Sequence, residues 1–313
     1  MKAHFERLAV LGLGLLGGSV ALAARRSGVA ECVVGATRRA EVRETALERG
    51  VVDAIDTPEN AVRGADLVVL ATPVYAMSDL VRTIAPTLDA GALVTDVGSV
   101  KAVLDETFPG LLPRGVHYVG SHPMAGSHHR GLAHARADLF EGAPCVVMRG
   151  RDTEIVERLC TFWRALGARV VLRDPREHDT EVAWMSHVPH VLAFAFAQAL
   201  DGAPDGAHAV SGPGFRDFTR IAHSEPELWG DILTANRKAI AGPLQAVADA
   251  LTSLAQTIET GDADDVERAI HAARNHLSKA PHESREAPPE TRKPIDPQAA
   301  PGGNGKRKND PNT

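Results

Sequence analysis

Short runs of consecutive apolar residues alternate with longer helical patterns over the first 172 residues of the chain. The apolar runs cover residues 8–11, 32–35, 67–71, 93–96, 117–119, 145–148 and 170–172. The early runs are continuous, as expected of parallel strands that are buried on both faces. Helical patterns, such as residues 17–27 and 39–49, lie between them. The sequence therefore predicts an α/β domain with a Rossmann-like, doubly wound sheet over residues 1–172.

The strand pattern stops after residue 174, and only helical patterns follow it. We expect helices over residues 177–200, 226–239, 243–260 and 262–277. Pro189 falls inside the first of these and should kink it, because proline lacks a backbone donor and clashes with the preceding turn. Residues 173–278 are thus expected to form an all-helical domain, whose apolar faces bury one another across a homodimer. Residues 279–313 are rich in Pro, Gly, Asn and charge, so we expect a disordered tail.

Composition and charge narrow the class of protein. The chain has 313 residues, of which 44% are hydrophobic and 24% charged, and this is ordinary for a globular protein with two domains. The net charge of −6 argues against nucleic acid as a partner. Three scattered cysteines indicate reduced thiols. Glycines interrupt the apolar stretch of residues 8–24, so no membrane contact is expected and we predict a cytoplasmic protein.

A glycine-rich motif, GLGLLG at residues 12–17, follows the first predicted strand and opens the first predicted helix. In a dinucleotide-binding turn the first glycine permits the turn, the second admits the pyrophosphate, and the third lets helix and strand pack closely. The free N–H groups of the helix would face the phosphates. The predicted cofactor-binding residues are therefore Gly12, Gly14, Leu15, Leu16 and Gly17. A glycine-rich turn without a ligand is the alternative.

The end of the second predicted strand bears on the choice between NAD and NADP. Enzymes that use NAD usually carry an acid there, which holds the ribose hydroxyls, but this chain has Thr37, Arg38 and Arg39. Arginine can pair with a 2′-phosphate, so we predict NADP as the cofactor. NAD stays possible if the two arginines only begin the next helix. Thr72 and Pro73 follow the fourth-strand pattern and should lie beside the nicotinamide ribose, although Thr72 could equally cap the strand.

A second motif, GSHPMAG at residues 120–126, places a histidine in what we interpret as a tight loop. Hydride can leave a hydroxyl-bearing carbon only if a base takes the hydroxyl proton, and a histidine near neutral pKa suits that task. His122 is therefore the candidate base, with a structural turn residue as the alternative. Ser99 follows the strand of residues 93–96 and could hold the substrate hydroxyl and orient His122, or serve as a helix N-cap. The two motifs together predict a dehydrogenase.

The helical part carries further polar candidates. The SHVPH motif of residues 186–190 places His187 and His190 near one face of the kinked helix. Arg216 and Arg220 follow a glycine-rich turn, where an arginine could clamp a carboxylate or form a surface ion pair. The remaining loop histidines have no ligand pattern with a carboxylate or cysteine partner, so we expect no metal site.

Taken in order, these motifs resemble the prephenate/arogenate dehydrogenase family of tyrosine biosynthesis. The matching stretches are GLGLLGGS, DVGSVK, GSHPMAG, SHVPH and GFRDFTRIA, which begin at residues 12, 96, 120, 186 and 214. The resemblance implies a Rossmann-like domain followed by a helical dimerisation domain. It also implies oxidative decarboxylation of prephenate to 4-hydroxyphenylpyruvate, or of arogenate to tyrosine, with hydride transfer to NAD(P)+.

The resemblance further implies roles for single residues. His122 would accept the ring-hydroxyl proton, Ser99 would hold the same hydroxyl, and Arg220 would bind a substrate carboxylate. The other substrate-binding candidates are His187, His190 at the side-chain end of the substrate, and Trp229, which would reach in from the partner subunit. Many family members carry glutamate six residues after the catalytic histidine, where this chain has His128. The choice between prephenate and arogenate therefore stays open.

Two other classes of protein fit part of the pattern. A β-hydroxyacid dehydrogenase or imine reductase also joins a Rossmann domain to a helical dimer domain, but relies on a lysine or aspartate where this helix has His187 and His190. A cofactor-binding regulator without catalysis is the second alternative. The presence of Ser99, His122 and Arg220 argues against it.

Overall fold

The computed structural model describes residues 5–126 and 130–278. The chain forms two compact units, of which the first ends at Asp249 and the second begins at Ala250. Both the tail predicted for residues 279–313 and His128 lie outside the described residues. Among the helices that are described, none combines the length and the apolar character needed to cross a membrane.

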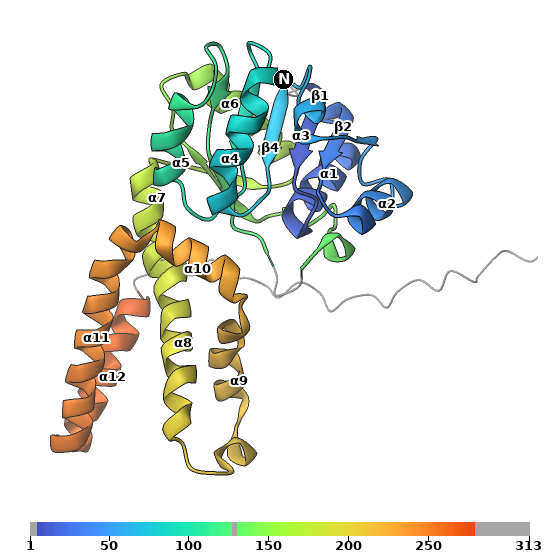
Figure 1. Cartoon of the computed structure of the whole chain (residues 1–313). Coiled ribbons are helices and arrows are strands. Elements are labelled where there is room, and N and C mark those ends of the chain that lie inside the picture. Colours follow the sequence, from blue (N-terminus) through green and yellow to red (C-terminus); the bar gives the residue numbers. More distant parts are fainter. Residues whose placement is uncertain (1–4, 127–129, 279–313) are drawn as a thin grey trace, which may run out of the picture. The chain divides into compact units, whose positions relative to one another are not determined.

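The first unit is built on a six-stranded parallel sheet in the order β3-β2-β1-β4-β5-β6 (Figure 1). The strands are β1 (Phe5–Leu11), β2 (Ala30–Ala36), β3 (Ala54–Ile55), β4 (Leu67–Leu70), β5 (Leu93–Asp96) and β6 (His117–Tyr118). The predicted Rossmann-like sheet is confirmed. The strand order reverses between β1 and β4, and ligands of such sheets bind outside the carboxyl ends of the strands at that point.

Helices cover both faces of this sheet. Alternate residues of β1 point to opposite sides, because the side-chain period of a strand is two. Leu8 and Val10 pack into a core with α1 (Leu15–Ser27) and α2 (Ala40–Glu48). Ala9 and Leu11 pack into a separate core, whose helices are α3 (Pro58–Ala61), α4 (Val74–Ile84) and α5 (Ala102–Thr107). Burial on both faces explains why these strands are continuous apolar runs.

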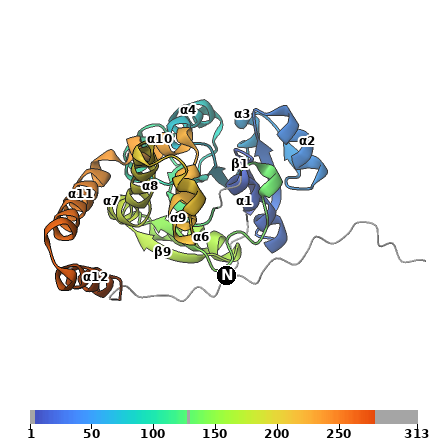
Figure 2. The same ribbon diagram turned by 90° about the horizontal axis from the view of Figure 1, so that it is seen from below.

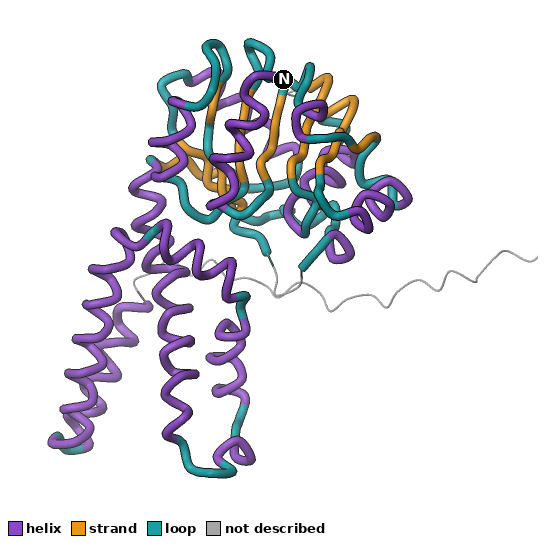
Figure 3. Tube along the Cα trace, in the orientation of Figure 1, coloured by secondary structure: helices purple, strands orange, loops and turns teal. Residues whose placement is uncertain are grey.

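A second sheet has the order β7-β8-β9. Figure 3 draws the strands of the chain in orange. Its strands are β7 (Ser121–Pro123), β8 (Pro144–Met148) and β9 (Arg169–Arg173), with β7 antiparallel to β8 and α6 (Thr153–Ala165) between β8 and β9. The prediction that His122 lies in a tight loop was wrong, because His122 is the middle residue of β7 and faces Val146 of β8. Pro123 is compatible with a strand here, since β7 is an edge strand and a missing donor costs no ladder bond.

The chain after β9 is helical as predicted, with two corrected boundaries. The expected helix of residues 177–200 consists of α7 (Pro175–Val182), a π-helical segment (Ala183–His187) and α8 (Val188–Ala199). Pro189 lies in the first turn of α8. The irregularity that proline imposes on a helix appears here as the π-helical segment before Pro189. The predicted kink itself stays a prediction.

The second correction concerns the last helices. After α9 (Pro213–Thr219), α10 (Pro226–Ala235) ends at Asn236, and α11 (Arg237–Thr260) then continues through Pro243. The predicted break between residues 239 and 243 was therefore misplaced. The buried Asn236 amide donates to the Asp179 carbonyl oxygen at 2.8 Å and lies 3.0 Å from Nδ1 of His187, which fixes the break. Within the second unit, α12 (Ala263–Ser278) follows α11.

Contacts between α10 and α4 join the helical segment to the Rossmann-like sheet, and the two helices lie side by side in Figure 2. The backbone N–H of Tyr75, in the first turn of α4, donates to Asp231 of α10 at 3.2 Å. A further contact joins α5 to α7. These contacts place residues 173–249 against the side of the sheet where α4 and α5 lie.

Candidate active site

The glycine motif forms the turn between β1 and α1. Gly12 has a φ of +107°, and a Cβ atom on it would lie 2.5 Å from the carbonyl oxygen of Ala71. A Cβ on Gly17 would overlap the carbonyl oxygen of Gly12. By contrast, no atom lies within 4 Å of the Cβ position of Gly14. The backbone therefore requires glycine at positions 12 and 17, whereas at Gly14 it is open to an approaching group.

The surroundings of this turn suit a dinucleotide. Gly14 is the N-cap of α1 and provides no side-chain hydrogen bond, so the N–H groups around Leu15 and Leu16 are available to a phosphate. Thr72 follows β4 and contacts the turn, since its Cγ2 lies 3.2 Å from the Cβ position of Gly12. The buried Thr72 hydroxyl has no hydrogen-bond partner in the described part of the chain. An orphaned buried hydroxyl beside an open turn fits a bound ligand that would satisfy it.

Thr37, Arg38 and Arg39 follow β2 at the same edge of the sheet. Arg39 is the N-cap of α2, and its backbone N–H donates to the Thr37 hydroxyl at 3.4 Å. The Thr37 carbonyl accepts from Nε of Arg43 at 2.9 Å. Arg38 and Arg39 are exposed, and neither forms an ion pair with an acid among the residues that the structure describes. Two guanidinium groups without an ion-pair partner among the described residues thus lie just after β2.

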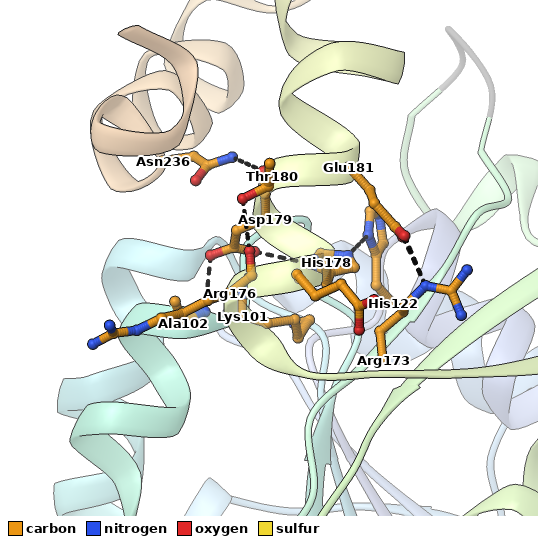
Figure 4. Close-up of polar contacts among 12 residues, drawn as sticks. Lys101, Ala102, His122, Arg173, Arg176, His178, Asp179, Thr180, Glu181 and Asn236 are labelled. Carbon is orange, nitrogen blue, oxygen red and sulfur yellow. Dashed lines mark hydrogen bonds and ion pairs between the residues drawn. The ribbon is translucent and has the colours of Figure 1, made fainter. Parts of the chain in front are cut away.

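His122 begins a chain of hydrogen bonds that runs through two adjacent residues of α7 (Figure 4). Its Nδ1 lies 2.9 Å from Nε2 of His178, and Nδ1 of His178 lies 2.8 Å from Oδ1 of Asp179. Asp179 Oδ1 also accepts from the backbone N–H of Lys101 at 2.8 Å, and its Oδ2 accepts from that of Ala102 at 2.9 Å. His178 and Asp179 are almost fully buried. The chain thus connects β7, α7 and the start of α5.

Contacts in the first turn of α7 fix the position of this helix. Asp174 and Glu177 form a capping box, and Pro175 occupies the first turn, where proline is favoured. Arg149, after β8, pairs with Asp174 and Glu177 at 3.2 Å each. These contacts hold α7 against the second sheet, with His178 and Asp179 facing inward.

A buried ion pair holds the other side of His122. Lys101 is completely buried and pairs with Asp96 at the end of β5. The Tyr118 hydroxyl donates to Asp96 at 2.8 Å, and the Ser121 hydroxyl donates to the Asp96 carbonyl at 2.6 Å. Ser121 precedes His122 in β7, so this cluster fixes the strand that carries the histidine. Removal of one partner from such a buried pair typically costs about 3–5 kcal/mol.

Burial sets the charge of His122. Desolvation lowers the pKa of the His122 imidazole well below its usual value near 6.5, and the neighbouring His178, Lys101 and His187 lower it further. At neutral pH the ring is therefore uncharged and can accept a proton. Its Nδ1 is engaged by His178, which leaves Nε2 as the nitrogen available for chemistry.

Ser99 is not the N-cap of α5. The N-cap is Lys101, it makes no side-chain capping bond, and Asp179 accepts the N–H groups of the first turn instead. The group that orients His122 is His178 rather than Ser99. His178 and Asp179 were not predicted as site residues, although they form an adjacent His-Asp pair shortly after the strand pattern ends. Ser99 is half-buried, lies three residues after the end of β5, and does not cap α5.

His187 and His190 form an aromatic group with Trp229. The His190 ring stacks on Trp229 with centroids 3.6 Å apart and planes at 21°, and its Nδ1–H donates to the Ser186 carbonyl at 2.8 Å. His187 lies edge-on to Trp229 and is buried, which lowers its pKa to about 4. Burial also lowers the pKa of His190, and nearby Arg220 contributes to that shift.

Trp229 therefore packs on His190 of its own chain, and its contact with a substrate of the partner subunit stays a prediction. It lies in α10, which the break at Asn236 and the contact with α4 hold in place. Arg220 is exposed at the end of α9, whereas Arg216 donates to the Ser211 carbonyl at 3.3 Å. No group of three or more metal-ligating side chains occurs within residues 5–126 and 130–278.

A parallel sheet with a glycine turn at its switch point, joined to a half-buried and uncharged histidine, defines a nicotinamide-dinucleotide-binding oxidoreductase. Residues 20–172 match the family model "Prephenate dehydrogenase, nucleotide-binding domain", and residues 174–272 match "Prephenate dehydrogenase, dimerization domain". The chain belongs to the prephenate dehydrogenase family.

Single relatives agree with the family models. The chain is 32% identical to prephenate dehydrogenase of Bacillus subtilis over 296 residues, which are 92% of this chain and 80% of the relative. The crystal structure of prephenate dehydrogenase from Aquifex aeolicus with hydroxyphenyl propionate and NAD+ superposes with a TM-score of 0.80 at 28% identity, over 87% of this chain and 98% of that one. Arogenate dehydrogenase of Synechocystis gives a TM-score of 0.76 at 31% identity, over 87% and 99%.

Proposed function

We propose that this protein catalyses the oxidative decarboxylation of prephenate or arogenate, yielding 4-hydroxyphenylpyruvate or tyrosine. The observation that carries the proposal is the half-buried, uncharged His122, whose Nδ1 contacts His178 while Nε2 has no partner among the described residues. The printed names of the relatives from Bacillus subtilis and Synechocystis support the two substrates. The bound dinucleotide supplies the hydride acceptor.

In this mechanism the chain's residues hold the ring and move one proton. Nε2 of His122 accepts the proton of the ring hydroxyl as the hydride leaves the same carbon. Ser99, freed from the N-cap role, would donate to that hydroxyl oxygen or accept from it. The ring carboxylate then leaves as carbon dioxide, the electron pair of the broken C–C bond makes the ring aromatic, and the resulting phenolate oxygen takes the proton back from Nε2 of His122. A general base typically contributes about 10²–10⁴-fold to such a step.

Arg220, His190 and Trp229 are the proposed contacts at the far end of the substrate. The exposed guanidinium of Arg220 can pair with a carboxylate through two parallel hydrogen bonds. His190 is held flat against Trp229, which fixes its ring plane. His187 is buried behind Trp229 and bound to Asn236, so we assign it to supporting that pair.

The test of this function is a turnover assay on the full-length chain. Prephenate and arogenate are each paired with NAD+ and NADP+, and the reduced nicotinamide is followed by its absorbance. We expect turnover with at least one pairing, together with release of one carbon dioxide per reduced nicotinamide. Reduction of the nicotinamide without carbon dioxide release would favour a hydroxyacid dehydrogenase, and no reduction with any pairing would favour a binding protein.

We propose NADP+ as the preferred cofactor, because the two unpaired arginines after β2 replace the acid that holds the ribose hydroxyls in NAD enzymes. The double variant Arg38→Ala/Arg39→Ala should raise KM for NADP+ by at least about 10-fold, since charge-assisted bonds to the phosphate contribute roughly 1.5–3 kcal/mol. KM for NAD+ should change little. Arg43→Ala, which changes a neighbouring arginine bound to a backbone carbonyl, is the matched control. Equal effects on both cofactors would contradict the proposal.

The pH dependence of kcat/KM reports on the base in the free enzyme. A base must be unprotonated to act, and burial lowers the pKa of His122, so activity should persist as the pH falls below 6.5. We expect the acid limb of the kcat/KM profile below pH 6.5, and we expect His122→Asn to lack it. An acid limb above pH 6.5 would mean that another group controls the reaction.

We further propose that the chain acts as a homodimer. The family model over residues 174–272 is described as a dimerization domain. Large apolar side chains are exposed on the helical segments of the first unit, among them Trp184, Phe196 and Phe218. Such a surface is typical of helices that pair with a second subunit. The cytoplasmic location stays a prediction.

A further inference from the structure

We infer that His178, held by Asp179, is a positioning residue for the reaction: it fixes His122 in the tautomer with a proton on Nδ1, so that Nε2 carries the lone pair. The inference rests on the proposed function for its consequence, because only a general base needs that lone pair. The assignment of the tautomer itself rests only on the hydrogen-bond geometry of Asp179, His178 and His122.

The direction of the hydrogen bonds follows from Asp179. An ionised carboxylate can only accept, and this one already accepts the backbone N–H groups of Lys101 and Ala102 at 2.8 and 2.9 Å. The remaining contact, 2.8 Å to Nδ1 of His178, must therefore be donated by the histidine. A neutral His178 with a proton on Nδ1 has a lone pair on Nε2.

The lone pair on Nε2 of His178 determines which ring nitrogen of His122 carries the proton. The 2.9 Å contact between Nε2 of His178 and Nδ1 of His122 needs one donor, and only His122 can provide it. The proton of neutral His122 is therefore on Nδ1, and Nε2 is left bare. Which ring nitrogen of a histidine is protonated is generally set by the hydrogen bond that the other nitrogen makes. Here three links transmit that choice from the start of α5 to β7.

The charged and titratable groups around His122 and His178 are consistent with this direction of the hydrogen bonds. From the segment between β5 and α5 come the buried Lys101 ammonium, whose charge opposes a second proton on the His122 ring, and the N–H groups at the start of α5, which donate to Asp179. The π-helical segment contributes His187, whose Nδ1 faces the Asn236 amide. From α7 comes Glu181, which is paired with Nε of Arg173 at 2.8 Å (Figure 4). Each acid of this group is thus already paired.

A pair of substitutions separates the contact with His122 from the contact with Asp179. A glutamine amide at position 178 can reach the place of Nε2 and offer its oxygen as an acceptor, whereas an asparagine amide matches only Nδ1 and leaves His122 without a partner. We expect His178→Gln to keep kcat within about 10-fold of the wild type. His178→Asn should lower kcat by about 100-fold or more, because loss of the orienting group can cost a catalytic histidine up to about 10⁴-fold. KM and dinucleotide affinity should change little in both. Equal kcat values for the two variants would overturn the inference.

The tautomer can also be observed without any substrate. The full-length chain is labelled with ¹⁵N-histidine and its dinucleotide is bound, and the His122 resonances are identified by their loss in His122→Asn. We expect Nδ1 to be protonated and Nε2 unprotonated in the wild type, and this preference to weaken in His178→Asn. A protonated Nε2 in the wild type would overturn the inference, even if turnover were normal. A chain that fails the turnover assay but shows the expected tautomer would instead contradict the proposed function alone.

Discussion

Replacing His122 with asparagine should lower kcat by about 10²–10⁴-fold while leaving dinucleotide affinity nearly unchanged. Asparagine keeps a polar group near Nδ1, so the contact with His178 and the strand pairing to Val146 can persist. What disappears is the group at Nε2 that takes the hydroxyl proton. Steady-state kinetics with saturating cofactor gives kcat, and titration of protein fluorescence with reduced cofactor gives the affinity.

The matched control for this variant is His117→Asn. His117 lies in the neighbouring strand β6 and takes no part in the hydrogen-bond chain, so the same chemical change there should leave kcat within a few-fold. Normal turnover by His122→Asn would remove this residue from the mechanism. A large loss in both variants would indicate a folding effect of the substitution rather than loss of a base.

Gly17→Ala should reduce both stability and cofactor binding, whereas Gly14→Ala should reduce cofactor binding alone. A Cβ atom on Gly17 meets the Gly12 carbonyl oxygen and lies 2.9 Å from Cβ of Ala71, so β1 and α1 must move apart. Overpacking of this kind typically costs about 1–3 kcal/mol of the free energy of unfolding, and occasionally more. Gly14 has an ordinary extended backbone and open space at its Cβ position, so alanine there meets no protein atom.

Thermal unfolding with and without dinucleotide separates the two effects. Without ligand, we expect a lower Tm for Gly17→Ala and an unchanged Tm for Gly14→Ala. With ligand, the stabilisation that the wild type gains should shrink in both variants, because binding to the folded state raises Tm by mass action. Undiminished ligand stabilisation of Gly14→Ala would mean that the pyrophosphate does not approach the backbone at this turn.

The apolar pattern predicts the centre of the main sheet well because its central strands are buried on both faces. In β1, β4 and β5 consecutive residues are buried, so their sequences do not show the alternation of apolar and polar residues that is typical of a half-buried strand. The two-residue β3 is too short to leave such a pattern. The three-residue β7 lies between glycines and contains Pro123, so its local sequence resembles a turn. It becomes a strand only because β8 provides a partner at the sheet edge.

The sequence predicts the site residues that stand in short motifs. It does not predict the residues that act only through contact with a distant segment of the chain. His122 and the glycine turn stand in short motifs, so their types and spacing indicate their roles. His178 and Asp179 lie 56 and 57 residues after His122 in a helix rich in charged residues, which is typical of a solvent-exposed face. Their burial against β7 and α5 depends on how α7 leaves the second sheet.

By itself, the amino-acid sequence determined the alternation of the main strands and helices, the need for glycine at the dinucleotide turn, and the presence of a histidine suited to proton transfer. These properties follow from local backbone sterics and from the period of apolar residues, which act over a few positions. Only the tertiary structure decided which groups surround that histidine. A carboxylate on α7, the N–H groups of α5 and a ring on β7 meet because separate elements pack together, and that meeting sets the direction of every hydrogen bond between them.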